Sequence, residues 1–199
     1  MFRTKLSAVF TLVSVALLVG AAWAQQPTSP PPDTLKVDYF SNANTSGAPD
    51  GTVRITNPGT SGGNICADIF VFDTDEELTE CCSCLITPDG LLTLSINNDL
   101  TGNPLTGVTL ATGVLKIVSA SPKGGACPMP TSIAPLAAVR DWVTHIQTGN
   151  AITENETLDA TFSSVEQVAL QGQCNSIKRV GSGKGICANS PALGAICNN

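Results

Sequence analysis

Hydrophobic and polar residues alternate along short segments of the chain, which is the pattern of β-strands with one buried face. The alternation covers residues 36–40, 53–56, 91–96 and 114–118. Residues 65–72 (ICADIFVF) are instead almost continuously apolar, as in a central strand covered on both faces. Turn residues recur about every ten positions, most clearly at 87–90 (TPDG). This pattern predicts a mainly β, antiparallel, sandwich-like domain.

The segment 139–148 fits two secondary structures. In a helix, four apolar residues would share one stripe: Val139, Trp142, Val143 and Ile146. However, β-branched and aromatic residues dominate the segment, and residues 148–150 (TGN) have the composition of a tight turn. We therefore favour a strand hairpin and keep the helix as the alternative.

Residues 164–179 form the best helix candidate. Ser163 and Glu166 have the spacing of a capping box, in which the serine hydroxyl accepts from the backbone at the helix start. Leu170, Cys174 and Ile177 share one face of this helix. The remainder, residues 181–199, is expected to be a Gly-rich coil held by its two cysteines.

The first 24 residues have the features of a secretory signal peptide. Arg3 and Lys5 precede an apolar stretch that ends at an A-x-A cleavage site, residues 22–24. An uncleaved membrane anchor is the alternative. Residues 25–34 form a Pro-rich spacer, so a single disulfide-rich β domain is expected over residues 35–199. We expect the mature protein to be secreted, periplasmic or attached to the cell surface, with no membrane span after cleavage.

Charge narrows the choice of partners. Removal of the signal peptide with Arg3 and Lys5 leaves eight basic and sixteen acidic side chains, so the net charge becomes −8. Such an acidic protein repels nucleic acid and anionic membrane surfaces. A nucleic acid partner is therefore not expected, whereas a surface polymer or a protein remains a possible partner.

Eight cysteines lie in the mature part of the chain: Cys66, Cys81, Cys82, Cys84, Cys127, Cys174, Cys187 and Cys197. An even number in an exported protein predicts a disulfide framework. A bond between adjacent cysteines is strained, so Cys81 and Cys82 should each pair elsewhere. We expect residues 81–84 to be a node that joins three parts of the chain, with Cys66, Cys127 and the C-terminal tail as suggested partners.

A metal or thiol-redox centre at Cys81, Cys82 and Cys84 is the more specific functional alternative for these cysteines. Zinc sites usually combine two separated C-x2-C pairs, whereas this cluster has the spacing C-C-x-C and no matching second pair. The disulfide framework is therefore preferred.

Two glycine-rich segments resemble functional motifs. Residues 59–63 (GTSGG) fit a nucleophile motif, but a strand rather than a helix is expected to follow, so we predict a Gly-rich hairpin loop. Residues 181–185 (GSGKG) resemble a phosphate loop but lack its spacing.

His145, which is the only histidine, lies four residues after Asp141. The carboxylate could orient the imidazole of a general base, but a surface or structural histidine is the preferred interpretation. With one histidine, a monomer cannot form a site with several histidine ligands.

Residues 73–77 (DTDEE), followed by Glu80, form the densest acidic run. Asp73, Asp75 and Glu77 are weak calcium candidates, because Ca²⁺ binds several carboxylate oxygens. Leu78 occupies the position of the glycine in an EF-hand loop, so we prefer an exposed acidic turn.

Residues 66–105, together with 141–147 (DWVTHIQ) and 181–187 (GSGKGIC), resemble an uncharacterised family of exported proteins from acidobacterial genomes. The resemblance implies a bacterial export route, in which the sequons at Asn44 and Asn155 would stay unmodified. It carries no activity, ligand or site residue.

These observations together predict an exported, non-enzymatic structural or surface-interaction protein without a catalytic residue or cofactor. One alternative is a carbohydrate- or calcium-binding extracellular module. The other is the thiol-redox or metal centre at the Cys81, Cys82 and Cys84 cluster.

Overall fold

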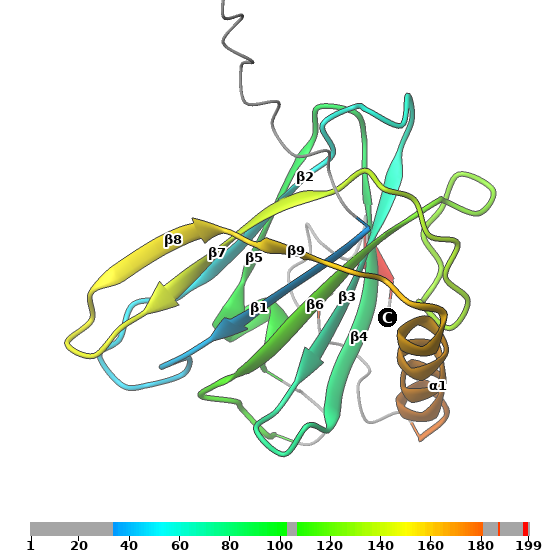
Figure 1. Ribbon diagram of the computed structural model, residues 1–199. Coiled ribbons are helices and arrows are strands. Elements are labelled where there is room, and N and C mark those ends of the chain that lie inside the picture. Colours follow the sequence, from blue (N-terminus) through cyan, green and yellow to red (C-terminus); the bar gives the residue numbers. More distant parts are fainter. Residues whose placement is uncertain (1–33, 103–106, 181–186, 188–196, 199) are drawn as a thin grey trace, which may run out of the picture. The chain divides into compact units, whose positions relative to one another are not determined.

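A computed structural model describes residues 34–102, 107–180, 187 and 197–198 (Figure 1). The predicted signal peptide, almost all of the Pro-rich spacer and the GSGKG segment lie outside these residues. The mainly β prediction is confirmed, because two antiparallel sheets and one long helix account for most of the described chain.

The larger sheet has six strands in the order β10-β4-β3-β6-β1-β9, and the smaller has four in the order β5-β2-β7-β8. The strands of the larger sheet are β1 (Leu35–Phe40), β3 (Ile65–Phe72), β4 (Leu78–Ile86), β6 (Gly113–Ala120), β9 (Leu158–Ala160) and β10 (Cys197–Asn198). Those of the smaller sheet are β2 (Thr52–Thr56), β5 (Leu91–Ser95), β7 (Arg140–Ile146) and β8 (Ile152–Glu156). A short π-helix, η1 (Ile96–Leu100), follows β5, and α1 spans Ser164–Val180.

The main hydrophobic core lies between the two sheets. Ile69 and Val71 of β3 belong to the same buried cluster as Val53 and Ile55 of β2. A second cluster covers the opposite face of the larger sheet, where Phe70 of β3 packs with Leu170 of α1 and with side chains of the segment 127–133. As a result β3 is buried along its whole length, as its continuous apolar run predicts.

The structure confirms the hairpin and the helix predicted near the C-terminal end. β7 and β8 pair in antiparallel register, and their turn contains Gly149 and Asn150 with positive φ angles of 80° and 66°. The backbone N–H of Glu166 donates to Ser163 Oγ at 3.1 Å, which is one half of the predicted capping box. The Glu166 carboxylate instead pairs with Lys116 on β6.

Two predictions about connections need correction. Residues 59–63 do not form a hairpin loop, because they lead from β2 in the smaller sheet to β3 in the larger one. Strand β4 was not predicted from the sequence. It carries Glu80, Ser83 and three cysteines at buried positions, so its polar residues hide the alternation that marks other strands.

Gly113, at the start of β6, shows how closely residues of the neighbouring strands β1 and β3 approach β6 within the larger sheet. A Cβ at this position would lie 2.7 Å from Phe40 Cζ and even nearer to the carbonyl oxygen of Phe72. We expect Gly113→Ala to lower the free energy of unfolding by about 2–3 kcal/mol, measured by urea denaturation. Gly172→Ala on α1 is the matched control, because its Cβ meets no atom within 4 Å. That change should stabilise the helix by about 0.5–1 kcal/mol. Equal effects of the two substitutions would contradict the packing at Gly113.

Candidate functional site

Strand β4 is the point from which three disulfides leave the larger sheet. Cys81 bonds to Cys174 of α1, Cys82 to Cys187, and Cys84 to Cys197 of β10. Side chains alternate along a strand, so Cys81 faces the helix, whereas Cys82 and Cys84 face the core between the sheets. The structure therefore agrees with the predicted node and with its link to the tail.

The suggested partners Cys66 and Cys127 do not join this node, because they bond to each other. Cys66 lies on β3, and Cys127 lies in the segment 121–134, whose buried side chains cover the same face of the sheet. All eight cysteines are thus accounted for by four pairs, and none is free.

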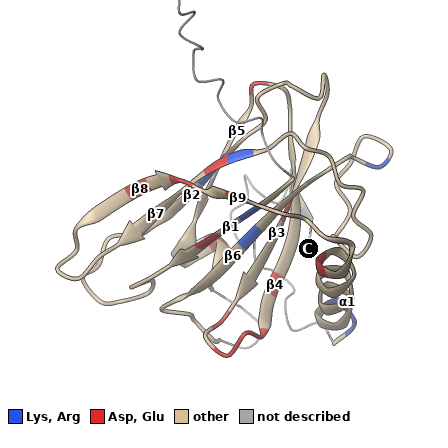
Figure 2. Ribbon diagram, viewed as in Figure 1, with Lys and Arg blue, Asp and Glu red and all other residues tan. Residues whose placement is uncertain are grey.

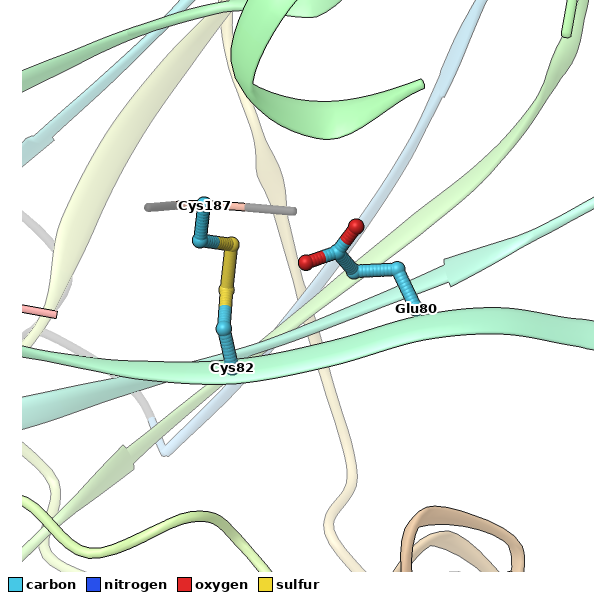
Figure 3. A group of neighbouring side chains, drawn as sticks. All are labelled: Glu80, Cys82 and Cys187. Carbon is cyan, nitrogen blue, oxygen red and sulfur yellow. A yellow bond between two sulfur atoms is a disulfide. The ribbon is translucent and has the colours of Figure 1, made fainter. Parts of the chain in front are cut away.

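Figure 3 shows the group that comes nearest to a metal site in the described part of the chain: Glu80, Cys82 and Cys187. One ligand atom from each lies within 4.8 Å of the others. The two sulfurs form a disulfide, however, and a metal ligand must be a thiolate. The geometry gives no support to a metal centre at Cys82 while this bond is intact.

Glu80 departs from the predicted exposed acidic turn. Its side chain is completely buried on β4, and neither carboxyl oxygen has a hydrogen-bond partner among the described residues. Burial, followed by the charge of Asp99 on η1, raises the pKa of Glu80 well above its ordinary value. Burial therefore favours the neutral form of this carboxyl group, which lies beside the Cys82–Cys187 disulfide.

The rest of the acidic run does form an exposed turn between β3 and β4, which Figure 2 shows as a group of acidic residues. Oδ1 of Asp73 accepts from the backbone N–H groups of Asp75 and Glu77 at 3.0 and 2.9 Å. The carboxylates of Asp73, Asp75 and Glu77 do not form a group within 4.8 Å. The structure does not bring the predicted calcium candidates together as ligands.

His145 and Asp141 point from β7 into the space between the sheets, on either side of Val143. The surface alternative for His145 is wrong, because this residue is 3% exposed and Asp141 is fully buried. His145 Nε2 lies 3.5 Å from Asp38 Oδ1, and the imidazole ring packs against Tyr39 with ring centroids 4.4 Å apart. The histidine thus occupies a structural position on the strand.

Asp141 has no hydrogen-bond partner for either carboxyl oxygen among the described residues. Burial is the largest cause that raises its pKa to about 7, while the positive charge of Lys36 acts in the opposite direction. Lys36 is itself buried and pairs with Asp159 of β9. These side chains form a polar cluster inside the sandwich rather than an open catalytic cleft.

A surface cavity of about 280 Å³ lies on the other face of the larger sheet. Its floor is formed by Cys66, Asp68 and Ala120, and its rim includes Lys123 and two serines. Ser83 Oγ donates to Asp68 Oδ1 at 2.5 Å. Burial raises the pKa of Asp68 to about 7, against the lowering effect of the Ser83 hydrogen bond.

Asp68 belongs to none of the motifs recognised in the sequence. A signal was nevertheless present, because Asp68 is the only charged residue in the run ICADIFVF. A carboxylate in a central strand is costly to bury and therefore indicates a special environment. The partner Ser83 lies opposite Asp68 on β4, a strand that was not predicted.

No family model, no curated protein and no solved structure matches this chain. Among the described residues, no helix combines the length and the apolar character that a bilayer span requires.

Proposed function

We propose that this chain is an exported, non-enzymatic structural or surface-interaction protein that acts outside the cytoplasm. The observation that carries the proposal is the set of four disulfides, three of which leave the single strand β4. Disulfides form and persist in oxidising compartments, and bonds that close long loops stabilise the folded domain. The acidic, threonine- and asparagine-rich composition supports the same class.

The location of the ionisable side chains supports a non-catalytic role. His145 and Asp141, the pair closest to a general base and its orienting carboxylate, are enclosed between the sheets. A general base must come within hydrogen-bond reach of a substrate proton, so this enclosure disfavours that role. Their burial favours a structural role for this pair.

Exposed apolar side chains support an interaction surface. Val165 and Val168 lie one turn apart on α1 and are 78% and 69% exposed. Leu158 of β9 is 81% exposed on the outermost strand of the larger sheet. Sheet edges and exposed apolar residues are common sites of contact with another molecule.

Export and oxidation can be tested on the full chain, including its N-terminal segment, after expression in a bacterial host. We expect a periplasmic or released product that begins at Gln25 and takes up no alkylating reagent without reductant, measured by intact mass. The reduced sample, which should take up eight equivalents, is the control. Retention in the cytoplasm, or modified thiols at Cys81, Cys82 or Cys84, would contradict the proposal.

The surface-interaction role is tested by sedimentation with envelope material from the organism that encodes the chain. The oxidised mature protein should sediment saturably, whereas the reduced and alkylated protein should not. Addition of CaCl₂ or of glycans is a further arm for the carbohydrate- or calcium-binding alternative. Equal recovery of oxidised and reduced protein in the pellet would indicate nonspecific adhesion and contradict the role.

A further inference from the structure

The cavity at Asp68 has the organisation of a preformed binding site. Buried residues of β3 and β6 form its floor, and exposed residues of the segment 121–134 form its rim. Its volume of about 280 Å³ suits a group of several heavy atoms, which is far more than one water molecule requires. A carboxylate at the floor of an otherwise largely apolar cavity is the type of polar group that fixes the orientation of a ligand.

The walls of this cavity are held by bonds that do not depend on a ligand. The Cys66–Cys127 disulfide ties the segment to β3. Ser121 N donates to Ala134 O at 2.8 Å, and Lys123 N donates to Ala126 O at 2.9 Å. Pro122 and Pro128 also line the cavity, and proline limits the backbone freedom of the wall. A ligand would therefore meet a site that is already ordered.

Burial of the Asp68 carboxylate at this position costs free energy of folding. Asp68 is 3% exposed, and its carboxylate accepts a hydrogen bond from Ser83 Oγ. An asparagine in its place would keep the same shape without a buried charge, so packing alone does not explain a carboxylate. Its raised pKa indicates that the ionised form has no adequate counter-charge in the protein.

The composition of the cavity excludes several ligand classes. Ca²⁺ requires six to eight oxygen ligands, often from several carboxylates, whereas Asp68 is the only carboxylate among the lining residues. A carboxylate floor opposes an anion. No aromatic residue lines the cavity, so the stacking platform typical of sugar sites is missing there.

We propose that this cavity binds a primary ammonium group on a short apolar stem, with Asp68 as its counter-ion. The carboxylate would accept a charge-assisted hydrogen bond from the ammonium. Ala120, Pro122 and Pro128 would contact the methylene stem. Such a group occurs in free alkylamines and at the end of a lysine side chain. The inference rests on the surface-interaction function proposed above, because it names the chemistry of the partner.

Lys123 is the other charged residue that lines this cavity. It is exposed at the turn formed by residues 123–126, so it lies on the rim rather than on the floor. Its positive charge at the rim repels an incoming cation. Lys123→Ala should therefore strengthen amine binding, which is a result that a purely structural Asp68 would not give.

The test is a ¹H–¹⁵N NMR titration of the oxidised protein with n-butylammonium chloride at constant ionic strength. We expect saturable shifts at the amides of Ser121, Lys123 and Ser132. n-Butanol, which has the same stem without the charge, is the matched control ligand. Asp68→Asn should weaken butylammonium binding at least about tenfold, since it removes one partner of a buried charge pair.

If Asp68→Asn does not fold, the wild-type protein can still be used to test whether an ammonium binds at Asp68. Binding of an ammonium must lower the pKa of the Asp68 carboxyl, which is followed by its ¹³C chemical shift with and without butylammonium. The peptide acetyl-Gly-Lys-Gly-amide distinguishes the two sources of the amine. Tighter binding of this peptide than of butylammonium would indicate a lysine on a protein partner, and the reverse would indicate free amines.

Three results would overturn the site: no saturable shifts with either probe, equal shifts with n-butanol, or unchanged binding in Asp68→Asn. These results are separable from the envelope experiment. If the protein sediments with envelope material but does not bind amines, the amine site is wrong and the surface role stands. If the protein binds amines but does not sediment, the surface role is wrong.

Discussion

Reduction of the disulfides should unfold this protein at neutral pH without added denaturant. The three bonds of β4 join residues that are 93, 105 and 113 positions apart. In the chain-entropy account, a bond that closes a loop of about 100 residues stabilises by about 4.7 kcal/mol. The contributions are not strictly additive, but a domain is stable by only about 5–15 kcal/mol in total. Loss of all three bonds therefore removes most or all of the free energy of unfolding.

Circular dichroism in the near and far ultraviolet, before and after addition of a phosphine reductant, measures this effect. The near-ultraviolet signal of the packed aromatic residues should disappear together with most of the β signal. The double substitution Cys66→Ala/Cys127→Ala is the matched control, because it removes one disulfide and leaves the β4 node intact. That variant should remain folded with a lower Tm. A reduced wild-type protein that keeps its native spectra would show that the core alone maintains the fold.

The sequence allowed much of this β-sandwich to be predicted because most strands obey a simple pattern. In β2 and β5 one face meets the core and the other faces solvent, so their residues alternate. In β3 both faces are covered, so ICADIFVF is continuous. The hairpin of β7 and β8 followed from its β-branched residues and its TGN turn.

Strand β4 could not be predicted by the same rules, since its buried positions carry Glu80, Ser83 and cysteines. Most of these polar and cysteine residues are stable at buried positions because each bonds to a partner that lies far away in the sequence. Cys81 depends on Cys174 of α1, and Ser83 depends on Asp68 of β3. The cavity floor was missed for the same reason, because Asp68 and Ser83 meet only after β3 and β4 have paired.

The second large effect is an unusual dependence of stability on pH. The pKa values of Asp68 and Asp141 are raised from 3.8 to about 7, and that of Glu80 is raised well above 4.5, with burial as the largest cause in each case. The folded protein therefore holds protons that the unfolded chain would release. This contribution is complete below pH about 4, declines as the pH rises, and is lost above pH about 7 for the two aspartates.

The expected result is a higher free energy of unfolding at pH 4.5 than at pH 7.5. A shift of about three pKa units corresponds to about 4 kcal/mol for each aspartate, as an upper estimate. For the ion pairs of the smaller sheet, the opposing loss of stability at low pH is less than this. The pairs Arg54–Glu154 and Arg140–Glu156 are partly exposed, and such pairs contribute about 0–1 kcal/mol.

Urea denaturation of the oxidised protein across pH 4–8 measures this dependence, and neutral isosteres assign it. The Glu80 carboxyl group has no hydrogen-bond partner among the described residues, so folding at neutral pH requires that it take up a proton. Glu80→Gln is neutral in both states and avoids this cost. It should therefore raise the free energy of unfolding at pH 7.5 more than at pH 4.5. Asp141→Asn should act in the same direction. Asp75→Asn, in the exposed turn between β3 and β4, should leave the pH dependence unchanged. A wild-type stability that rises from pH 4.5 to pH 7.5 would mean that these carboxyl groups are ionised and solvated, and that the interior described around Glu80 and Asp141 is incorrect.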